Sequence, residues 1–150
     1  MEIAIATSSG PVDQPVDDAS PRLLSGVSVL VVDDHEDALD ILVAVLAFHG
    51  ALVIAARNPI EALERVKLVR PDVIVSDLAM PDMTGVQFLQ QVHALPSQMG
   101  APTPALALTA FVQDEHRRQA LEHGFQAFLP KPMNPTLLVR EIARLAGKAG

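Results

Sequence analysis

Cysteine, tryptophan and tyrosine are all absent from this sequence of 150 residues. Without cysteine, the chain has no disulfide scaffold, thiolate zinc site or cysteine nucleophile. With no tryptophan or tyrosine and a formal net charge of −7, it lacks the basic surface and stacking rings typical of nucleic-acid binding. No apolar run approaches the ~20 residues of a membrane span, and the N-terminus lacks the basic start of a secretory signal. We therefore expect a cytoplasmic protein without membrane insertion or direct contact with DNA or RNA.

The composition is that of one globular domain with an additional N-terminal segment. Residues 1–25 mix serine, proline, glycine and aspartate without a lasting period, which predicts a flexible tail or linker. Regular patterning begins after this segment, so we place a single domain at 26–147 and a short C-terminal end at 148–150. Hydrophobic residues make up 49% of the chain, enough for a domain of this size to fold around its own core.

Short apolar runs alternate with helical periodicity five times along the domain. The runs predict strands at 27–32, 52–56, 72–77, 104–109 and 125–129. The segments between and after them predict helices at 37–50, 59–70, 86–95, 113–124 and 136–146. Asn58-Pro59 and Asn134-Pro135 have the form of a helix cap followed by proline at the first helical position. The alternation predicts an α/β fold with a parallel sheet covered by helices on both faces.

Polar side chains follow four of the five predicted strands. Asp33 and Asp34 end the first strand and Asp77 ends the third, while Thr109 ends the fourth and Lys131 follows the fifth. Ligands of an open parallel sheet bind beyond the carboxyl ends of its strands, so these groups should meet at one edge. Carboxylates brought so close repel one another unless a cation neutralises them, and their hard oxygens suit Mg²⁺. The set predicts a site for phosphoryl chemistry.

Each of these residues also has an ordinary explanation when taken alone. An Asp-Asp pair after a strand is often a solvated turn or helix cap, and a single lysine is often a surface charge. The joint placement at four strand ends is not predicted by those explanations. We interpret His35 as an exposed loop residue rather than a metal ligand, and Glu36 and Asp37 as a solvated first helical turn.

The motifs VLVVDD, DVIVSDLAMPDMTG, ALALTA and FLPKP resemble, in order and spacing, those of the response-regulator receiver family over residues 27–146. The resemblance implies a single doubly wound five-stranded parallel sheet of order 2-1-3-4-5 flanked by five helices, a flavodoxin-like architecture. It also implies that Asp77 accepts a phosphoryl group from a phosphohistidine. By the same resemblance, Asp34, Asp77 and the main-chain carbonyl of Ala79 would ligate Mg²⁺, with Asp33 helping through water.

The resemblance further implies a switch and a set of partners. Lys131 would pair with the acyl phosphate, Thr109 would hydrogen-bond to it, and Phe128 would occupy the position of the switch aromatic. The switched surface would comprise the fourth helix, fifth strand and fifth helix, which could also form a homodimer. The phosphodonor would be a sensor histidine kinase or a histidine phosphotransfer protein, and the output an unidentified downstream protein. We expect no enzyme activity beyond self-phosphorylation and self-dephosphorylation. The Lys131–Pro132 bond is often cis in such proteins.

Two features depart from common family members. Phe128 stands where relatives commonly carry tyrosine, so this side chain has no hydroxyl. Ala79 and Phe111, two residues beyond Asp77 and Thr109, offer no polar group to orient an attacking water. Either their absence slows self-dephosphorylation, or Phe111 packs away from the site and the lifetime is ordinary.

Four alternatives remain open from sequence. A phosphohydrolase resembling the haloacid-dehalogenase group would carry Asp-x-Asp, whereas Leu78 and Ala79 follow Asp77 here. A flavodoxin-like cofactor binder would usually present an aromatic platform, which the sequence scarcely offers. The chain could also be an interaction module that is never phosphorylated, or a receiver cut from a hybrid histidine kinase, which the long loop SQMGAPTP resembles.

Overall fold

The computed structural model describes residues 22–96, 102–110 and 113–147. Most of the predicted tail, part of the SQMGAPTP loop and Phe111 lie outside these ranges. Five parallel strands form one sheet, in the order β3-β2-β4-β5-β6. These are β2 (Ser28–Val32), β3 (Leu52–Ala56), β4 (Val73–Ser76), β5 (Ala105–Thr109) and β6 (Ala127–Pro130). Counted along the chain this order is 2-1-3-4-5, which confirms the predicted fold.

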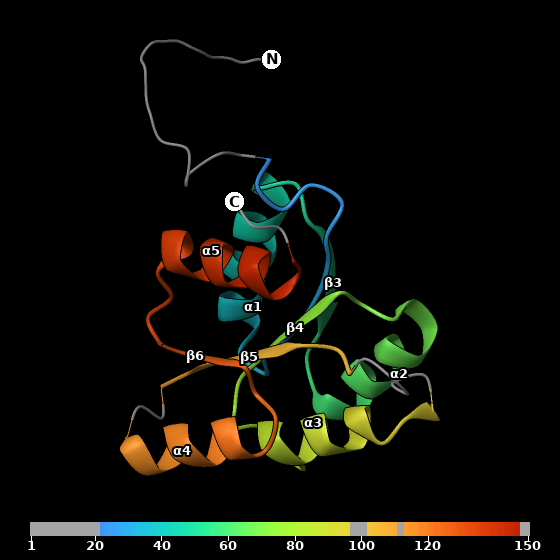
Figure 1. Ribbon diagram of the computed structural model, residues 1–150, viewed down its shortest axis with the longest axis vertical. Coiled ribbons are helices and arrows are strands. Elements are labelled where there is room, and N and C mark those ends of the chain that lie inside the picture. Colours follow the sequence, from blue (N-terminus) through green and yellow to red (C-terminus); the bar gives the residue numbers. More distant parts are fainter. Residues whose placement is uncertain (1–21, 97–101, 111–112, 148–150) are drawn as a thin grey trace, which may run out of the picture.

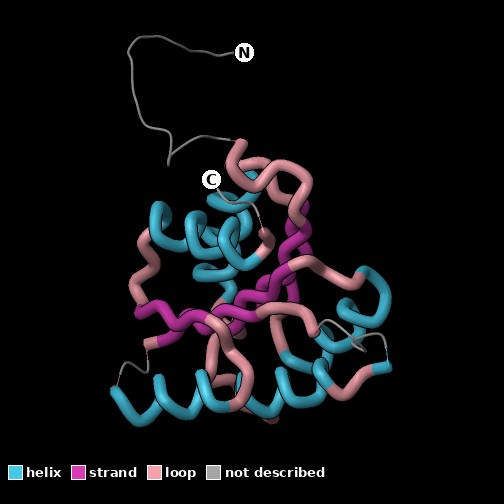
Figure 2. Tube along the Cα trace, in the orientation of Figure 1, coloured by secondary structure: helices cyan, strands magenta, loops and turns pink. Residues whose placement is uncertain are grey.

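A helix comes after each strand, as the sequence pattern predicted. The helices are α1 (Glu36–Phe48), α2 (Pro59–Val69), α3 (Gly85–His93), α4 (Asp114–Glu122) and α5 (Pro135–Leu145). Figure 1 shows α1 and α5 on one face of the sheet and α2, α3 and α4 on the other. Figure 2 shows the sheet as the middle layer between these two helical layers. Within the described ranges, none of the helices is long and apolar enough to cross a membrane.

The strand residues divide between two hydrophobic cores because successive side chains point to opposite faces of a sheet. Val29 and Val31 of β2 belong to the core shared with α1 and α5. Leu30 and Val32 belong to the core shared with α2, α3 and α4, where Phe88 is fully buried. Burial on both faces explains why the strands are near-continuous apolar runs rather than alternating ones.

Both predicted asparagine caps are present. Asn58 Oδ1 accepts a hydrogen bond from the Glu61 amide at 2.7 Å, and Asn134 Oδ1 accepts one from the Leu137 amide at 3.1 Å. Proline comes directly after each cap, at the start of α2 and of α5. These side chains satisfy amides that a helix leaves unpaired at its N-terminus, so the two helices begin where the sequence predicted.

The packed part of the chain extends further towards the N-terminus than residue 26, where the sequence pattern placed the domain start. Leu24 is fully buried in the core beside α1, and its amide donates a hydrogen bond to the carbonyl oxygen of His49 at 2.9 Å. Leu23 and Leu24 form a pair of leucines flanked by polar residues, which carries no periodic signal, so the burial of Leu24 was not evident from the sequence.

Candidate functional site

The carboxyl ends of the strands bring the predicted site residues together. Asp33 and Asp34 come after β2, Asp77 after β4, and Lys131 after β6. The Lys131 ammonium lies 2.7 Å from Asp33 Oδ2 and 3.1 Å from Asp77 Oδ2, and donates a hydrogen bond to each. Asp33 and Asp77 are both buried, so the two carboxylates share one cation at the sheet edge. The lysine is therefore part of the acidic cluster and not an isolated surface charge.

The surroundings of Lys131 favour its charged form. Partial burial works against the ammonium ion, but the hydrogen bonds and negative charges of Asp33 and Asp77 outweigh it and raise the pKa of Lys131 above its usual value of 10.5. A raised folded pKa means that the stabilisation is complete below about pH 10.5 and is lost as pH rises through the folded pKa.

Replacing Lys131 with methionine should lower the free energy of unfolding by about 2 kcal/mol near pH 8, because two buried carboxylates lose their charged donor. The difference from the wild type should shrink at about pH 11, where the lysine itself begins to lose its proton. Urea unfolding at the two pH values measures both effects. Lys67→Met is the control, since Lys67 lies 3.7 Å from Glu64 in an exposed ion pair and should contribute little. A difference that is equal at both pH values would contradict the ion-pair explanation.

The acidic cluster has the donor set of a cation site. Ligand atoms of Asp33, Asp34, His35 and Asp77 all lie within 4.8 Å of one another. Asp34 Oδ1 is buried and makes no hydrogen bond, although the His35 ring nitrogen lies 3.4 Å away. A buried carboxylate oxygen without a hydrogen-bond donor is costly unless a cation satisfies it. Carboxylate oxygens are the ligands that Mg²⁺ prefers, so the residues present fit that ion.

The segment after β4 holds Asp77 against the start of α3. The Ala79 amide donates a hydrogen bond to Asp77 Oδ1 at 3.2 Å. Thr84 caps α3 by accepting from the Gln87 amide at 3.1 Å, and the Gln87 side chain accepts from the Thr84 amide at 3.0 Å. This reciprocal pair is a capping box, which determines where the helix begins. The loop from Asp77 to α3 is thus anchored at both ends.

Gly85, the first residue of α3, was not identified as important from sequence. Its amide donates to the Leu78 carbonyl oxygen at 2.8 Å. A Cβ at this position would press on the Asp77 carbonyl oxygen and lie 2.9 Å from Leu78 Cα, both of them backbone atoms. Glycine is therefore needed for the close approach of α3 to the end of β4. The only sequence signal was a glycine at a helix start, eight residues after Asp77.

Replacing Gly85 with alanine should lower the free energy of unfolding by about 2 kcal/mol, because the added methyl group displaces backbone rather than a flexible side chain. The sign is diagnostic, since an unhindered glycine-to-alanine change in a helix normally stabilises by roughly 0.5–1 kcal/mol. Urea unfolding measures the change, with Gln90→Ala on the exposed side of α3 as the control. If Gly85→Ala instead raised the free energy of unfolding, the backbone at Asp77 would be able to shift and accept the methyl group without destabilising the protein.

The remaining predicted residues lie on β5, on β6 and in the loops beside them. Thr109 is fully buried at the end of β5, and its carbonyl oxygen accepts the Lys131 amide at 2.9 Å. Phe128 is half-buried in β6, pairs in register with Ala107 and packs on the core shared with α2, α3 and α4. Ala79, in the loop after β4, is half-buried. The Lys131–Pro132 bond is cis, as the resemblance led us to expect. Phe111 lies outside the described residues, so its predicted role in water access stays a prediction.

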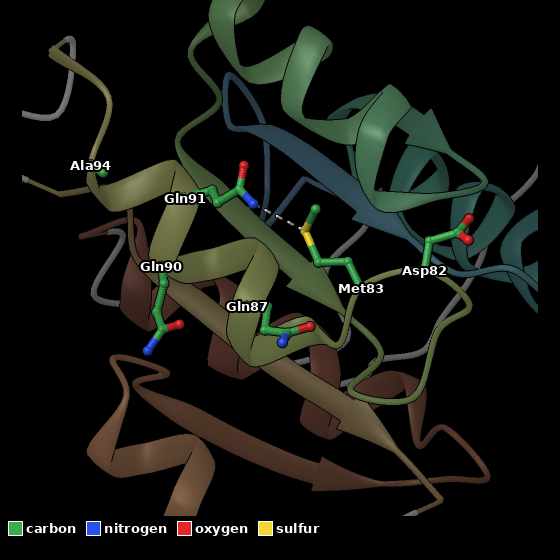
Figure 3. A pocket seen from close by; sticks show the side chains of 6 residues that line it. All are labelled: Asp82, Met83, Gln87, Gln90, Gln91 and Ala94. Carbon is green, nitrogen blue, oxygen red and sulfur yellow. Dashed lines mark hydrogen bonds between the residues drawn. The ribbon is translucent and has the colours of Figure 1, made fainter.

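Two surface hollows flank α3 away from the acidic cluster. Figure 3 shows the larger, of about 450 Å³, beside the loop that carries Asp82 and Met83. The Met83 side chain turns towards Gln91, whose Nε2 donates to its sulfur at 3.8 Å. The smaller, of about 310 Å³, has Leu78 and His116 among its lining residues. Asp33, Asp34, Asp77 and Lys131 line neither hollow, so both lie apart from the cluster.

The five-stranded parallel sheet agrees with comparison to known proteins. The sequence model of the response regulator receiver domain matches residues 29–143. The chain belongs to the response-regulator receiver family. This receiver is 34% identical to the chemotaxis protein CheY4 of Vibrio cholerae, whose solved structure it matches with a TM-score of 0.73 over 79% of this chain and 98% of that chain. It also matches the receiver domain of a signal transduction histidine kinase from Syntrophus aciditrophicus, with a TM-score of 0.72, 28% identity, and coverage of 81% and 91%.

Curated relatives include proteins of several lengths. The receiver is 42% identical to an uncharacterized 14.6 kDa protein of Leptolyngbya boryana, over 79% of this chain and 89% of that protein. It is 36% identical to the response regulator MprA of Mycobacterium ulcerans, over 71% of this chain but 44% of MprA. It is 31% identical to the sensor histidine kinase GacS of Pseudomonas protegens, over 81% of this chain but 13% of GacS. The same kind of receiver therefore occurs in both regulators and kinases.

Proposed function

We propose that this receiver accepts a phosphoryl group on Asp77 from a phosphohistidine, in the presence of Mg²⁺, and thereby changes its affinity for a downstream protein. The observation that supports this most directly is the cluster in which Lys131 bridges Asp33 and Asp77 beside the unsatisfied oxygen of Asp34. Buried carboxylates that share one lysine form a site prepared for a further cation and for a phosphoryl group.

In the proposed reaction, a carboxylate oxygen of Asp77 attacks the phosphorus, the phosphorus–nitrogen bond of the donor breaks, and the donor histidine leaves as neutral imidazole after taking up a proton. Asp33, Asp34, Asp77 and the carbonyl of Ala79 would hold the Mg²⁺. When bound, the ion neutralises charge on the transferring phosphoryl group. Lys131 already contacts Asp77 and can follow the charge as it moves onto the phosphoryl oxygens.

The product places up to about two negative charges where a single carboxylate charge stood. Lys131 then exchanges its contact with the Asp77 carboxylate for one with the phosphoryl group, and the Thr109 hydroxyl moves to donate a hydrogen bond to it. Thr109 and Phe128 lie on the paired strands β5 and β6, so a shift at Thr109 can reach the surface of α4, β6 and α5. That surface is the proposed contact for a downstream protein or for a second copy of the chain.

The proposed partners are those of the family. Receiver domains interact with histidine kinases or histidine phosphotransfer proteins, and a cytoplasmic location is consistent with that role. The receiver would catalyse only its own phosphorylation and dephosphorylation, so it would have no separate substrate. We therefore propose that it is not an enzyme in the ordinary sense. Either a regulator or part of a kinase could contain this receiver, because the matched relatives include both. Transfer from a panel of phosphorylated kinases would identify the donor.

The direct test is incubation of the wild type with MgCl₂ and phosphoramidate or acetyl phosphate, followed by intact-mass measurement. We expect one phosphoryl group per chain, stable in acid and labile in base, as an acyl phosphate should be. Chelation of Mg²⁺ with EDTA before the donor is added should prevent the reaction. A chain that stays unlabelled with Mg²⁺ and several donors would instead favour an interaction module that is never phosphorylated.

A further inference from the structure

Ser76, the last residue of β4, is a polar side chain buried in an apolar layer. It is fully buried, and its register neighbours Val32 and Ala107 both belong to the core shared with α2, α3 and α4. Side chains alternate between the faces of a strand, so Ser76 points into the same core as Ile74. A hydroxyl in such surroundings is costly unless it forms a hydrogen bond. The Ser76 Oγ forms one by donating to the carbonyl oxygen of Asp77 at 2.8 Å.

This bond completes the set of contacts that hold Asp77. The Asp77 amide donates to the Val32 carbonyl oxygen at 3.1 Å. In the carboxylate, Oδ1 accepts from the Ala79 amide at 3.2 Å and Oδ2 accepts from Lys131 at 3.1 Å. The carbonyl oxygen accepts from Ser76. The serine hydroxyl therefore holds the peptide group that follows Asp77, through which the main chain continues to Ala79.

Gly85 accommodates the same carbonyl oxygen from the other side. A Cβ at this position would press on the Asp77 carbonyl oxygen, so the missing side chain leaves room for it. The carbonyl thus lies between the start of α3 and the hydroxyl of Ser76. A peptide group that is closely packed on one side and hydrogen-bonded on another resists rotation. Its orientation in turn directs the Ala79 amide towards the Asp77 carboxylate.

We propose that Ser76 is a positioning residue for phosphoryl transfer. Its hydroxyl fixes the peptide after Asp77 and so holds both the Asp77 carboxylate and the main chain of Ala79 in place for the reaction. A misplacement of about 1 Å can lower a rate by about 100-fold, and we expect the loss of this one bond to cost about tenfold. The inference rests on the proposed function and adds a residue to its site. The ordinary alternative is that the bond only satisfies a buried hydroxyl.

Ser76→Thr and Ser76→Val test the proposal as a pair. The two new side chains have nearly the same size and both suit a strand, but only threonine has a hydroxyl. With saturating MgCl₂ and a fixed concentration of phosphoramidate, Ser76→Thr should be labelled within about threefold of the wild-type rate, and Ser76→Val about tenfold more slowly than Ser76→Thr. Ser76→Ala, which adds no volume to the core, should be slow as well. Intact-mass time courses measure all four rates.

Hydrogen exchange of the Ala79 amide tests the same contact without any phosphodonor. In the wild type this amide donates to Asp77 Oδ1. If Ser76 holds the peptide between them, the Ala79 amide should exchange about tenfold faster in Ser76→Val than in Ser76→Thr, as measured by NMR. The Gln87 amide, which donates to Thr84 in the capping box, should exchange alike in both variants. This comparison separates a local effect from a general loss of stability.

Ser28→Ala is the matched control for the labelling rates. Ser28 begins the neighbouring strand β2, and its hydroxyl donates to Asp72 Oδ2 at 3.2 Å, at the opposite end of the sheet from Asp77. This variant should be labelled at the wild-type rate. Equal labelling of Ser76→Thr and Ser76→Val would overturn the proposal, because the hydroxyl would then make no difference. Labelling of Ser76→Ala at the wild-type rate would overturn it as well.

Failure here is distinguishable from failure of the proposed phosphorylation. If the wild type is labelled and both Ser76→Val and Ser76→Ala match its rate, only the positioning role is wrong. If no donor labels the wild type, the proposed phosphorylation fails. Exchange of the Ala79 amide then still decides whether Ser76 holds the main chain after Asp77.

Discussion

Asparagine in place of Asp77 should reduce phosphoryl incorporation from phosphoramidate to background. The amide has nearly the same shape as the carboxylate and its Oδ1 can still accept the Ala79 amide, which in the wild type donates to Asp77 Oδ1 at 3.2 Å. The neutral amide is, however, a poor nucleophile and forms no acyl phosphate. Since geometry is retained while nucleophilicity is lost, we expect at least about a 100-fold lower rate in intact-mass time courses.

Asp82→Asn is the matched control for this experiment. Asp82 is an exposed carboxylate in the same loop, five residues after Asp77, and its φ of 73° is a conformation that asparagine tolerates well. This variant should be labelled at the wild-type rate. Equal labelling of Asp77→Asn and the wild type would refute Asp77 as the acceptor and direct attention to Asp33 and Asp34.

Asparagine in place of Asp34 should have two effects of opposite sign. Without Mg²⁺ the variant should be more stable than the wild type, because one of several crowded carboxylates has lost its charge. With Mg²⁺ it should gain almost nothing, whereas the wild type gains about 2.7 kcal/mol when the ion is at 100 times its dissociation constant. The variant loses the Mg²⁺ response because Asp34 is expected to bind the ion directly, through a carboxylate whose Oδ1 has no hydrogen-bond donor.

Urea unfolding with and without MgCl₂ measures both effects in one series. Glu36→Gln is the control, since Glu36 is an exposed carboxylate on the first turn of α1, 3.4 Å from Arg57, and should leave the Mg²⁺ response as in the wild type. If Mg²⁺ stabilises the Asp34→Asn variant as much as it stabilises the wild type, Asp34 is not a ligand of the ion. Stabilisation by Mg²⁺ in every variant would show that the ion acts elsewhere.

The structure and the family match support the alternative functions left open by the sequence to different degrees. Membership of the receiver family favours phosphoryl acceptance over hydrolysis of a separate substrate. An Asp-x-Asp phosphohydrolase needs a second carboxylate two residues after its nucleophile, and the half-buried Ala79 stands there instead. An interaction module that is never phosphorylated would have no need of a complete site. Here Lys131 is in direct contact with both Asp33 and Asp77, which favours the proposed function.

Much of the fold could be predicted from the sequence because its signals are local. The alternation of apolar runs with helical periodicity, and the asparagine caps before Pro59 and Pro135, depend on neighbours a few residues away. Since parallel strands point the same way, the residues at their carboxyl ends must gather at one edge, and so the site residues could be named without coordinates. The order of the strands came instead from the family resemblance.

Only the tertiary structure decided which of these groups touch. Lys131 contacts Asp33 and Asp77 across 98 and 54 residues of sequence, and no local rule sets those distances. The space beside Gly85 depends on how closely α3 approaches β4, and Leu24 is buried because the chain returns to His49. The sequence pattern marked His35 correctly as exposed, yet its ring nitrogen lies beside two aspartates. Such contacts are set by the packing of whole elements against one another, which sequence period and capping do not determine.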